Sequence, residues 1–167
     1  MEKDILKVLV KGDSYLIEEK KPNRTFALLK LLIKNKIEPF CITRLHPKHV
    51  KRKYKIKVKN LWLSKKEYDY CLSPTDLGVL VSTAEKFIKH TKNGVVLIEG
   101  LEYLILNNDF PKILRVVEDI NESIMESNCR LILPIDPDTL DPRELALLER
   151  SLIVIEREKE VGKELTL

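Results

Sequence analysis

The residue types best suited to chemistry lie in a segment that joins an expected strand to an expected helix. A phosphate-binding loop occupies the same setting and reads glycine, four residues, then glycine, lysine and serine or threonine. In this chain the corresponding positions are Glu18, Asn23, Arg24 and Thr25. Only the threonine is identical, and glycine is needed there because the loop uses positive φ angles and lets phosphate approach the backbone amides. The segment therefore predicts a degenerate phosphate loop with Arg24 and Thr25 as candidate ligand-binding residues.

Acidic side chains end three of the expected strands. Glu18 and Glu19 place negative charge near the position that phosphate would take. Glu99 follows four apolar residues, which is the pattern of the strand that holds magnesium in phosphate-loop enzymes. The same pattern also fits an ordinary central strand that ends in a solvated acid. Glu102 offers an acid–base partner for Glu99, but the spacing does not fix their geometry. Asp136 also follows an apolar strand and favours a turn, and Glu99 and Asp136 are further candidate ligand-binding residues.

Other catalytic and metal-binding arrangements are not supported by the spacing. Ser14 and Ser64 lack the glycines of a nucleophile elbow, and no catalytic residue is assigned. His46 and His49 have no cysteine pair or acidic cluster at ligand spacing, so no metal site is expected. The three cysteines form an odd set without a close pair, which predicts buried free thiols.

A basic segment without acids runs from residue 44 to residue 59. Its candidate contacts for nucleic acid or a partner are Arg44, Lys51, Arg52, Lys53, Lys55, Lys57 and Lys59. Tyr54 and Trp62 are the rings that would stack on bases. Residues 54–59 also alternate between apolar residues and lysine, which predicts a half-exposed edge strand whose charges prevent aggregation, and the lysine-rich composition favours this interpretation. A third possibility is that the acidic C-terminal half of the chain docks on the basic half of a second copy or of a partner.

Composition bounds the class of protein. The chain has 167 residues and a net charge of +4, but residues 1–66 carry a net +13 and residues 67–167 a net −9. We expect a single α/β domain over 1–156 and a charged tail over 157–167. The longest run without a charged residue has eight residues, while a membrane span needs about 20. The acidic N-terminus is unlike a secretion signal. Together these features predict a cytoplasmic protein with no membrane partner. The absence of glutamine beside many Lys and Glu residues is typical of hyperthermophile proteins.

The expected elements alternate between strand and helix. Strands are predicted at 14–18, 40–43, 54–59 continuing into 61–63, 95–98, 131–135 and 152–155. Helices are predicted over 24–34, after Ser73-Pro74, from Pro111, and after a cap at Asp141-Pro142-x-Glu144. Strands that are apolar on both faces imply a parallel sheet covered on both sides. The sequence predicts a three-layer α-β-α sandwich with a mostly parallel sheet and a basic β-ribbon insertion.

Several blocks spread over residues 10–155 carry a family resemblance. They are Gly12-x-x-Tyr15-Leu16, Thr43-Arg44-x-x-Pro47, Trp62-Leu63-Ser64, 96–105 with Asn108-Asp109-Phe110, and 133–137 followed by Leu148-Glu149-Arg150. They resemble the archaeal domain-of-unknown-function family 835, in which an Asp often stands at the position of Glu99. The resemblance implies an archaeal protein of no established activity, with relatives that occur alone or joined to sensory and signalling modules. It also implies a degenerate relative of RecA-like and clock-type ATPases, and it supplies no catalytic residues.

These observations predict a non-catalytic regulatory or signalling module that self-associates or binds a protein partner and needs no cofactor. One alternative is a divergent ATPase that uses the loop 20–25 and Glu99 with a nucleotide and magnesium. The other is nucleic-acid binding through residues 44–59. The charge division adds the hypothesis that Arg24 faces Glu99 across the sheet edge where the strands end.

Overall fold

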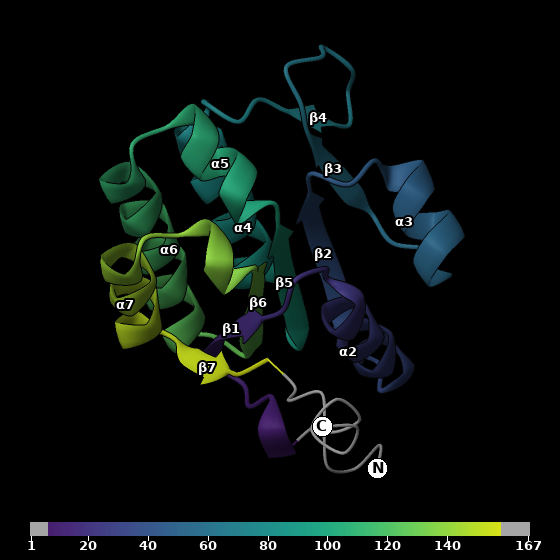
Figure 1. Cartoon of the computed structure of the whole chain (residues 1–167). Coiled ribbons are helices and arrows are strands. Elements are labelled where there is room, and N and C mark those ends of the chain that lie inside the picture. The colour runs from purple at the N-terminus through teal and green to yellow at the C-terminus, as the bar shows by residue number, and fades with distance from the viewer. Residues whose placement is uncertain (1–6, 158–167) are drawn as a thin grey trace, which may run out of the picture.

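The computed structural model describes residues 7–157, in which helices lie on both faces of a central β-sheet (Figure 1). Seven parallel strands make a single sheet in the order β4-β3-β2-β5-β6-β1-β7. The strands are β1 (Ser14–Glu18), β2 (Glu38–Thr43), β3 (Asn60–Leu63), β4 (Cys71–Leu72), β5 (Gly94–Glu99), β6 (Cys129–Ile135) and β7 (Ile153–Ile155). The helices are α2 (Asn23–Lys34), α3 (Pro47–Tyr54), α4 (Leu77–His90), α5 (Leu101–Asn107), α6 (Phe110–Met125) and α7 (Pro142–Ser151), with a 3-10 turn η1 at Pro137–Thr139.

Helices cover both faces of the sheet, as the sequence predicts. Because side chains alternate along a strand, Leu16 of β1 packs into one cluster with residues of α4, α5, α6 and α7. Its neighbours Tyr15 and Ile17 pack into a second cluster with residues of α2 and α3. The predicted three-layer α-β-α sandwich is confirmed, and the apolar character of both strand faces follows from burial on both sides.

The predicted basic β-ribbon is wrong. Pro47 begins α3, and the His46 side chain caps it by accepting a hydrogen bond from the Lys48 amide at 3.1 Å. The helix ends at Tyr54, and Lys55, which follows it, has a left-handed φ of 58°. Residues 55–59 belong to no strand, although Ile56 is buried as its alternation with lysine indicated. A proline-capped helix therefore replaced the first part of the expected strand.

Two other local features differ from the expectation. The amide of Asp76 donates to the Ser73 carbonyl at 3.1 Å, so the Ser73-Pro74 pair forms a turn and α4 begins only at Leu77. Helix α5 was not expected, because its seven residues are too short to show clear helical spacing. The predicted capping box of Asp141 and Glu144 is confirmed at the start of α7.

Two of the three cysteines are fully buried thiols. Cys41 and Cys129 lie in the core and Cys71 is half-buried, and all three are free. Burial raises the pKa of Cys41 to about 12. Over residues 7–157, none of the helices is long and apolar enough to span a membrane. The predicted charged tail is described only at Arg157, and residues 158–167 lie outside the described residues.

Candidate functional site

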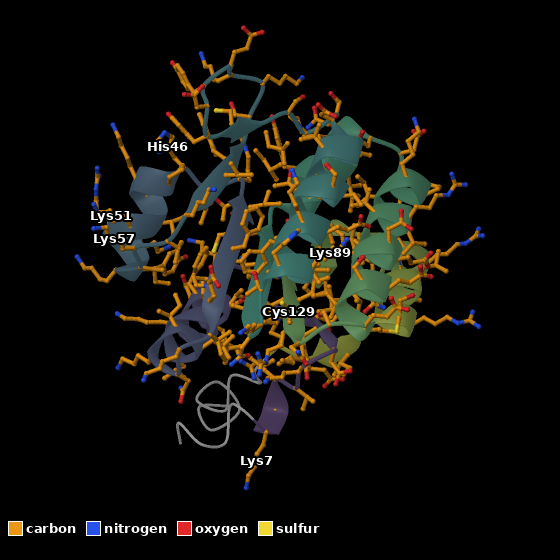
Figure 2. All side chains as sticks on the ribbon, turned by 180° about the vertical axis from the view of Figure 1, so that it is seen from behind. Lys7, His46, Lys51, Lys57, Lys89 and Cys129 are labelled. Atoms are coloured by element: carbon orange, nitrogen blue, oxygen red, sulfur yellow. The ribbon has the colours of Figure 1, made fainter. Side chains whose placement is uncertain are left out.

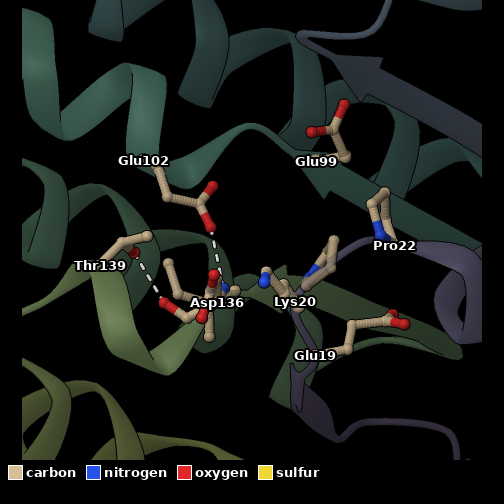
Figure 3. Close-up of a pocket in the computed structure, with 9 residues that line it drawn as sticks. Glu19, Lys20, Pro22, Glu99, Glu102, Asp136 and Thr139 are labelled. Atoms are coloured by element: carbon tan, nitrogen blue, oxygen red, sulfur yellow. Dashed lines mark hydrogen bonds between the residues drawn. The ribbon is translucent and has the colours of Figure 1, made fainter.

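The carboxyl ends of β1, β5 and β6 form one edge of the sheet. Strand β6 lies between the other two, so the residues that follow all three strands come together there. A cavity of about 220 Å³ opens at this edge (Figure 3). It is lined by Glu19, Lys20, Pro22, Glu99, Glu102, Pro134, Ile135, Asp136 and Thr139. Four carboxylates and one ammonium face this space, which is therefore acidic.

Glu19 binds the start of helix α2. Its Oε1 accepts a hydrogen bond from the Arg24 amide at 2.9 Å, and its Oε2 accepts one from the Thr25 amide at 2.9 Å. The Thr25 hydroxyl also donates to Oε2. The first amides of a helix have no partner within the helix and attract anions, phosphate included. In this protein a carboxylate of the chain itself occupies that anion position.

Glu99 ties β5 to the loop that follows β2. Its Oε1 accepts hydrogen bonds from the amides of Arg44 at 3.1 Å and Leu45 at 2.9 Å. Burial raises the pKa of Glu99, the hydrogen bond from Leu45 opposes that rise, and repulsion from Glu102 adds to it. One side-chain oxygen of Glu99 is thus engaged in holding the fold.

Glu102 and Asp136 also bind backbone amides. Glu102 Oε1 accepts from the Asp136 amide at 3.0 Å, the contact drawn as a dashed line in Figure 3. Asp136 Oδ1 accepts from the Asp138 amide at 3.0 Å, which makes the turn that the sequence predicts. Asp136 also lies 3.5 Å from the Arg157 guanidinium. These contacts give the cavity acids structural partners within the chain.

The four predicted ligand residues separate into two pairs. Glu99 and Asp136 line the cavity together, while neither Arg24 nor Thr25 belongs to its lining as described within residues 7–157. Thr25 is fully buried, and Arg24 Nη1 donates to the Glu156 carbonyl at 2.8 Å, next to β7. The hypothesis that Arg24 faces Glu99 is therefore wrong, because the guanidinium turns toward the opposite flank of β1.

Sequence reasoning missed what the acids do. It placed the negative charge of Glu19 near the phosphate position but did not identify the contact with α2. The distance along the chain hid it, because Glu19 precedes Thr25 by six residues whereas a capping side chain is normally two or three residues away. The missing cap was itself a signal, because Pro22 at the N-cap position has no side chain that can accept a hydrogen bond.

The predicted basic surface divides in the same way. Lys51, Arg52, Lys53, Lys55, Lys57 and Lys59 are all exposed on α3 and the segment after it. Arg44 is exposed as well, but its side chain is engaged by the fold, since its Nη1 donates to the Leu63 carbonyl at 2.8 Å and its guanidinium lies 4.1 Å from the ring centre of Tyr103. The Tyr54 ring stacks on Phe26 at 4.2 Å and is therefore engaged within the fold.

Comparison with known proteins places the chain in a family. Residues 18–152 match the family described as "Protein of unknown function (DUF835)". The chain belongs to the DUF835 family. This confirms the resemblance drawn from the sequence blocks, and it assigns no activity. Among curated proteins, none matches the chain.

Solved structures show the same fold as this DUF835 chain at low sequence identity. A Pyrococcus horikoshii OT3 protein (PH0250) is 15% identical and superposes with a TM-score of 0.64, covering 95% of this chain and 88% of that one. A KaiC-like protein of the same organism (PH0186) is 14% identical with a TM-score of 0.60, covering 90% of this chain and 76% of that one. The RecA-like and clock-type topology implied by the resemblance is thus confirmed as a fold.

A buried carboxylate beside the site predicts a pH-dependent stability. Glu18 is 8% exposed, and its Oε2 has no hydrogen-bond partner among the described residues. Burial raises the pKa of Glu18, and repulsion from Glu149 and Glu156 adds to the rise. Because the raised pKa means that the charged form destabilises the fold, we expect Glu18→Gln to stabilise the protein by about 1 kcal/mol at neutral pH.

The sign of this effect sets its pH range. The gain should shrink as the pH falls through the raised pKa of Glu18 and vanish below the ordinary glutamate value of about 4.3, because Glu18 is then protonated in both states. Thermal unfolding of the wild type and Glu18→Gln between pH 4 and pH 8 measures it, with the exposed Glu38→Gln as the matched control. An equal gain at every pH would show that the charge of Glu18 is not the cause.

Proposed function

We propose that this DUF835 chain is a non-catalytic regulatory interaction module built on a nucleotide-binding fold. The contact of Glu19 with α2 carries the proposal. Its carboxylate accepts hydrogen bonds from the amides of Arg24 and Thr25, which are the donors that a phosphate at this helix end would use. A phosphate entering the loop would have to displace this carboxylate and would meet its negative charge.

The charge of the cavity supports the same proposal. Glu99, Glu102 and Asp136 line it together with Glu19, and Lys20 is the one basic residue of its lining within residues 7–157. A nucleotide triphosphate carries several negative charges, which this surface repels. The hydrogen bonds from Arg44 and Leu45 further restrict Glu99 as a magnesium ligand, because they hold one of its two oxygens. These features disfavour the alternative of an ATPase that uses the loop and Glu99.

The regulatory and partner-binding part of the proposal rests on surface charge. Residues 1–66 carry a net +13 and residues 67–167 a net −9, and we propose that this division gives two copies complementary surfaces. Such complementarity steers docking and weakens as salt rises. We therefore propose a protein partner or self-association in a role that needs no bound cofactor.

Calorimetry with ATP and magnesium tests the proposal. We expect no saturable heat at ligand concentrations up to the millimolar range, where a Kd of about 1 mM corresponds to a binding free energy of only about −4.1 kcal/mol. No release of phosphate above the rate of the Glu99→Gln variant is expected. Light scattering at low and high salt tests self-association, and the apparent mass should fall as salt rises.

Two results would contradict this proposal. Tight ATP binding with turnover that Glu99→Gln abolishes would establish the ATPase alternative. A monomer at every salt concentration would remove self-association and leave a different protein as the partner. The Glu99→Gln variant keeps an oxygen that can accept from Arg44 and Leu45, so it separates loss of charge from loss of the fold.

A further inference from the structure

A second cavity lies beside α3, away from the acidic edge. Its volume is about 270 Å³, and it is formed by α3 and the segment that leads into β3. Its lining consists of Pro47, Lys48, Val50, Lys51, Ile56, Lys57, Val58 and Asn60. Three ammonium groups thus surround an apolar floor, and no carboxylate belongs to the described lining. Figure 2 shows Lys51 and Lys57 close together at this edge of the molecule, below His46.

The lysines of this basic cavity have no acidic partners among the described residues. Within residues 7–157, no ion pair joins Lys48, Lys51 or Lys57 to a carboxylate. Like charges held together in this way create a positive potential that attracts an anion. The four exposed cations Arg52, Lys53, Lys55 and Lys59 extend the same potential along α3 and the following segment. This charge arrangement fits a chain of phosphates better than a single ion.

A row of aromatic rings adjoins the basic cavity. Trp62 and Tyr70 are nearly parallel, at 20° and 6.4 Å between ring centres, and Tyr70 and Tyr68 are nearly parallel at 18° and 5.6 Å. Tyr68 is 56% exposed and Tyr70 is 39% exposed. His46 caps α3 at the cavity and lies 4.6 Å from Trp62, so it joins the row to the lysines.

We propose that this edge of the protein binds single-stranded nucleic acid, with the lysines on its phosphates and the aromatic row stacked on its bases. A cationic groove beside exposed rings is the combination that single strands require, since bases of every type present a flat face. An acidic peptide would satisfy the lysines but has no regular series of flat groups for the rings. The inference does not depend on the acidic cavity, because it involves none of the residues that line it.

The only tryptophan of the chain makes the site directly observable. Anisotropy of labelled oligo-dT and oligo-U of about 15 nucleotides measures affinity, because single-strand sites span roughly 4–16 nucleotides. Stacking near Trp62 should quench its emission on binding. With about three phosphate contacts, log affinity should fall with log salt at a slope of about −2, and the two oligomers distinguish DNA from RNA.

Matched variants locate the binding surface. Lys51→Ala combined with Lys57→Ala should weaken binding roughly tenfold at low salt and make the salt slope shallower by about 1.4. Lys86→Ala combined with Lys89→Ala removes the same charge from exposed positions on α4 and should change neither quantity appreciably. Tyr70→Ala should weaken binding at least about fivefold and reduce the quenching of Trp62. Circular dichroism verifies that each variant is folded.

Several outcomes would overturn the inference. Absence of binding at low salt would remove the site, and equal losses in the two double variants would show attraction by net charge alone. Equal affinity for duplex and single strand would remove base stacking. If polyglutamate competes as well as an oligonucleotide and Trp62 emission does not respond to either, the surface recognises an acidic protein instead.

Discussion

Replacement of Glu19 by alanine is expected to lower the free energy of unfolding by about 2 kcal/mol. The carboxylate satisfies the amides of Arg24 and Thr25 at the start of α2. Pro22, at the N-cap position, makes no side-chain cap hydrogen bond, so the variant leaves these donors to water. The loss combines a missing cap with a missing favourable charge at the positive end of the helix.

The same replacement should create an anion site. Once Glu19 is absent, the two amides and the Thr25 hydroxyl are free to bind phosphate or sulfate. We therefore expect inorganic phosphate to stabilise Glu19→Ala while leaving the wild type unchanged, since a ligand that binds only the folded state stabilises it. Guanidinium unfolding with and without phosphate at constant ionic strength measures both effects.

Two control variants separate capping from charge. Glu19→Gln keeps an acceptor oxygen for the helix amides but removes the charge, and its stability should lie between those of the wild type and Glu19→Ala. Glu38→Ala removes an exposed acid at the start of β2 and should change neither stability nor phosphate response appreciably. Equal stabilisation of the wild type by phosphate would mean that the loop still accepts anions, which would count against the proposed function as well.

The layers of the fold were predictable from apolar patterns, because both faces of the sheet are buried. Strand β1 agrees with its expected range residue for residue. Strand β6 begins two residues before its expected range. The region after β2 was not predictable in the same way. Alternating lysines at Lys55, Lys57 and Lys59 follow the period of a strand, yet His46 and Pro47 began a helix just before them. Local capping thus outweighed an alternation that only Ile56 and Val58 use for packing.

The candidate site shows a different limit. The strand order β5-β6-β1 brings Glu99 and Asp136 to one cavity, which follows from placing their strands in a parallel sheet. The direction of a long side chain does not follow from such an order. Arg24 reaches the Glu156 carbonyl beside β7, whereas the phosphate-loop comparison directed it into the site. Only the tertiary structure decides between such partners, which lie 132 residues apart in the sequence.

Replacement of Gly100 by alanine is expected to destabilise the protein by about 3 kcal/mol or more. Gly100 has a φ of 111°, which residues with a Cβ rarely adopt. An added Cβ would lie 2.7 Å from the Arg44 Cβ and 3.2 Å from the Arg44 backbone nitrogen. Relief of this overlap requires the backbone around Arg44 to move, because the overlapping atoms of Arg44 are its Cβ and backbone nitrogen and not the end of its side chain.

The displacement would reach the site through Glu99. The amide of Arg44 donates to the Glu99 side chain, so moving Arg44 away from Gly100 would also weaken this contact. Since about 1 kcal/mol changes the melting temperature of a domain this size by roughly 2–4 °C, we expect Gly100→Ala to melt about 10 °C lower than the wild type in calorimetry.

A second glycine supplies the matched control for Gly100→Ala. Gly78 lies in the first turn of α4 with no atom within 4 Å of an added Cβ. Gly78→Ala should therefore stabilise the protein by about 0.5–1 kcal/mol, because alanine loses less backbone entropy in a helix. Opposite signs for the same chemical change would locate the cost in the contact with Arg44. A small loss in both variants would mean that the loop after β2 yields, and that its hydrogen bonds to Glu99 hold the edge of the cavity only weakly.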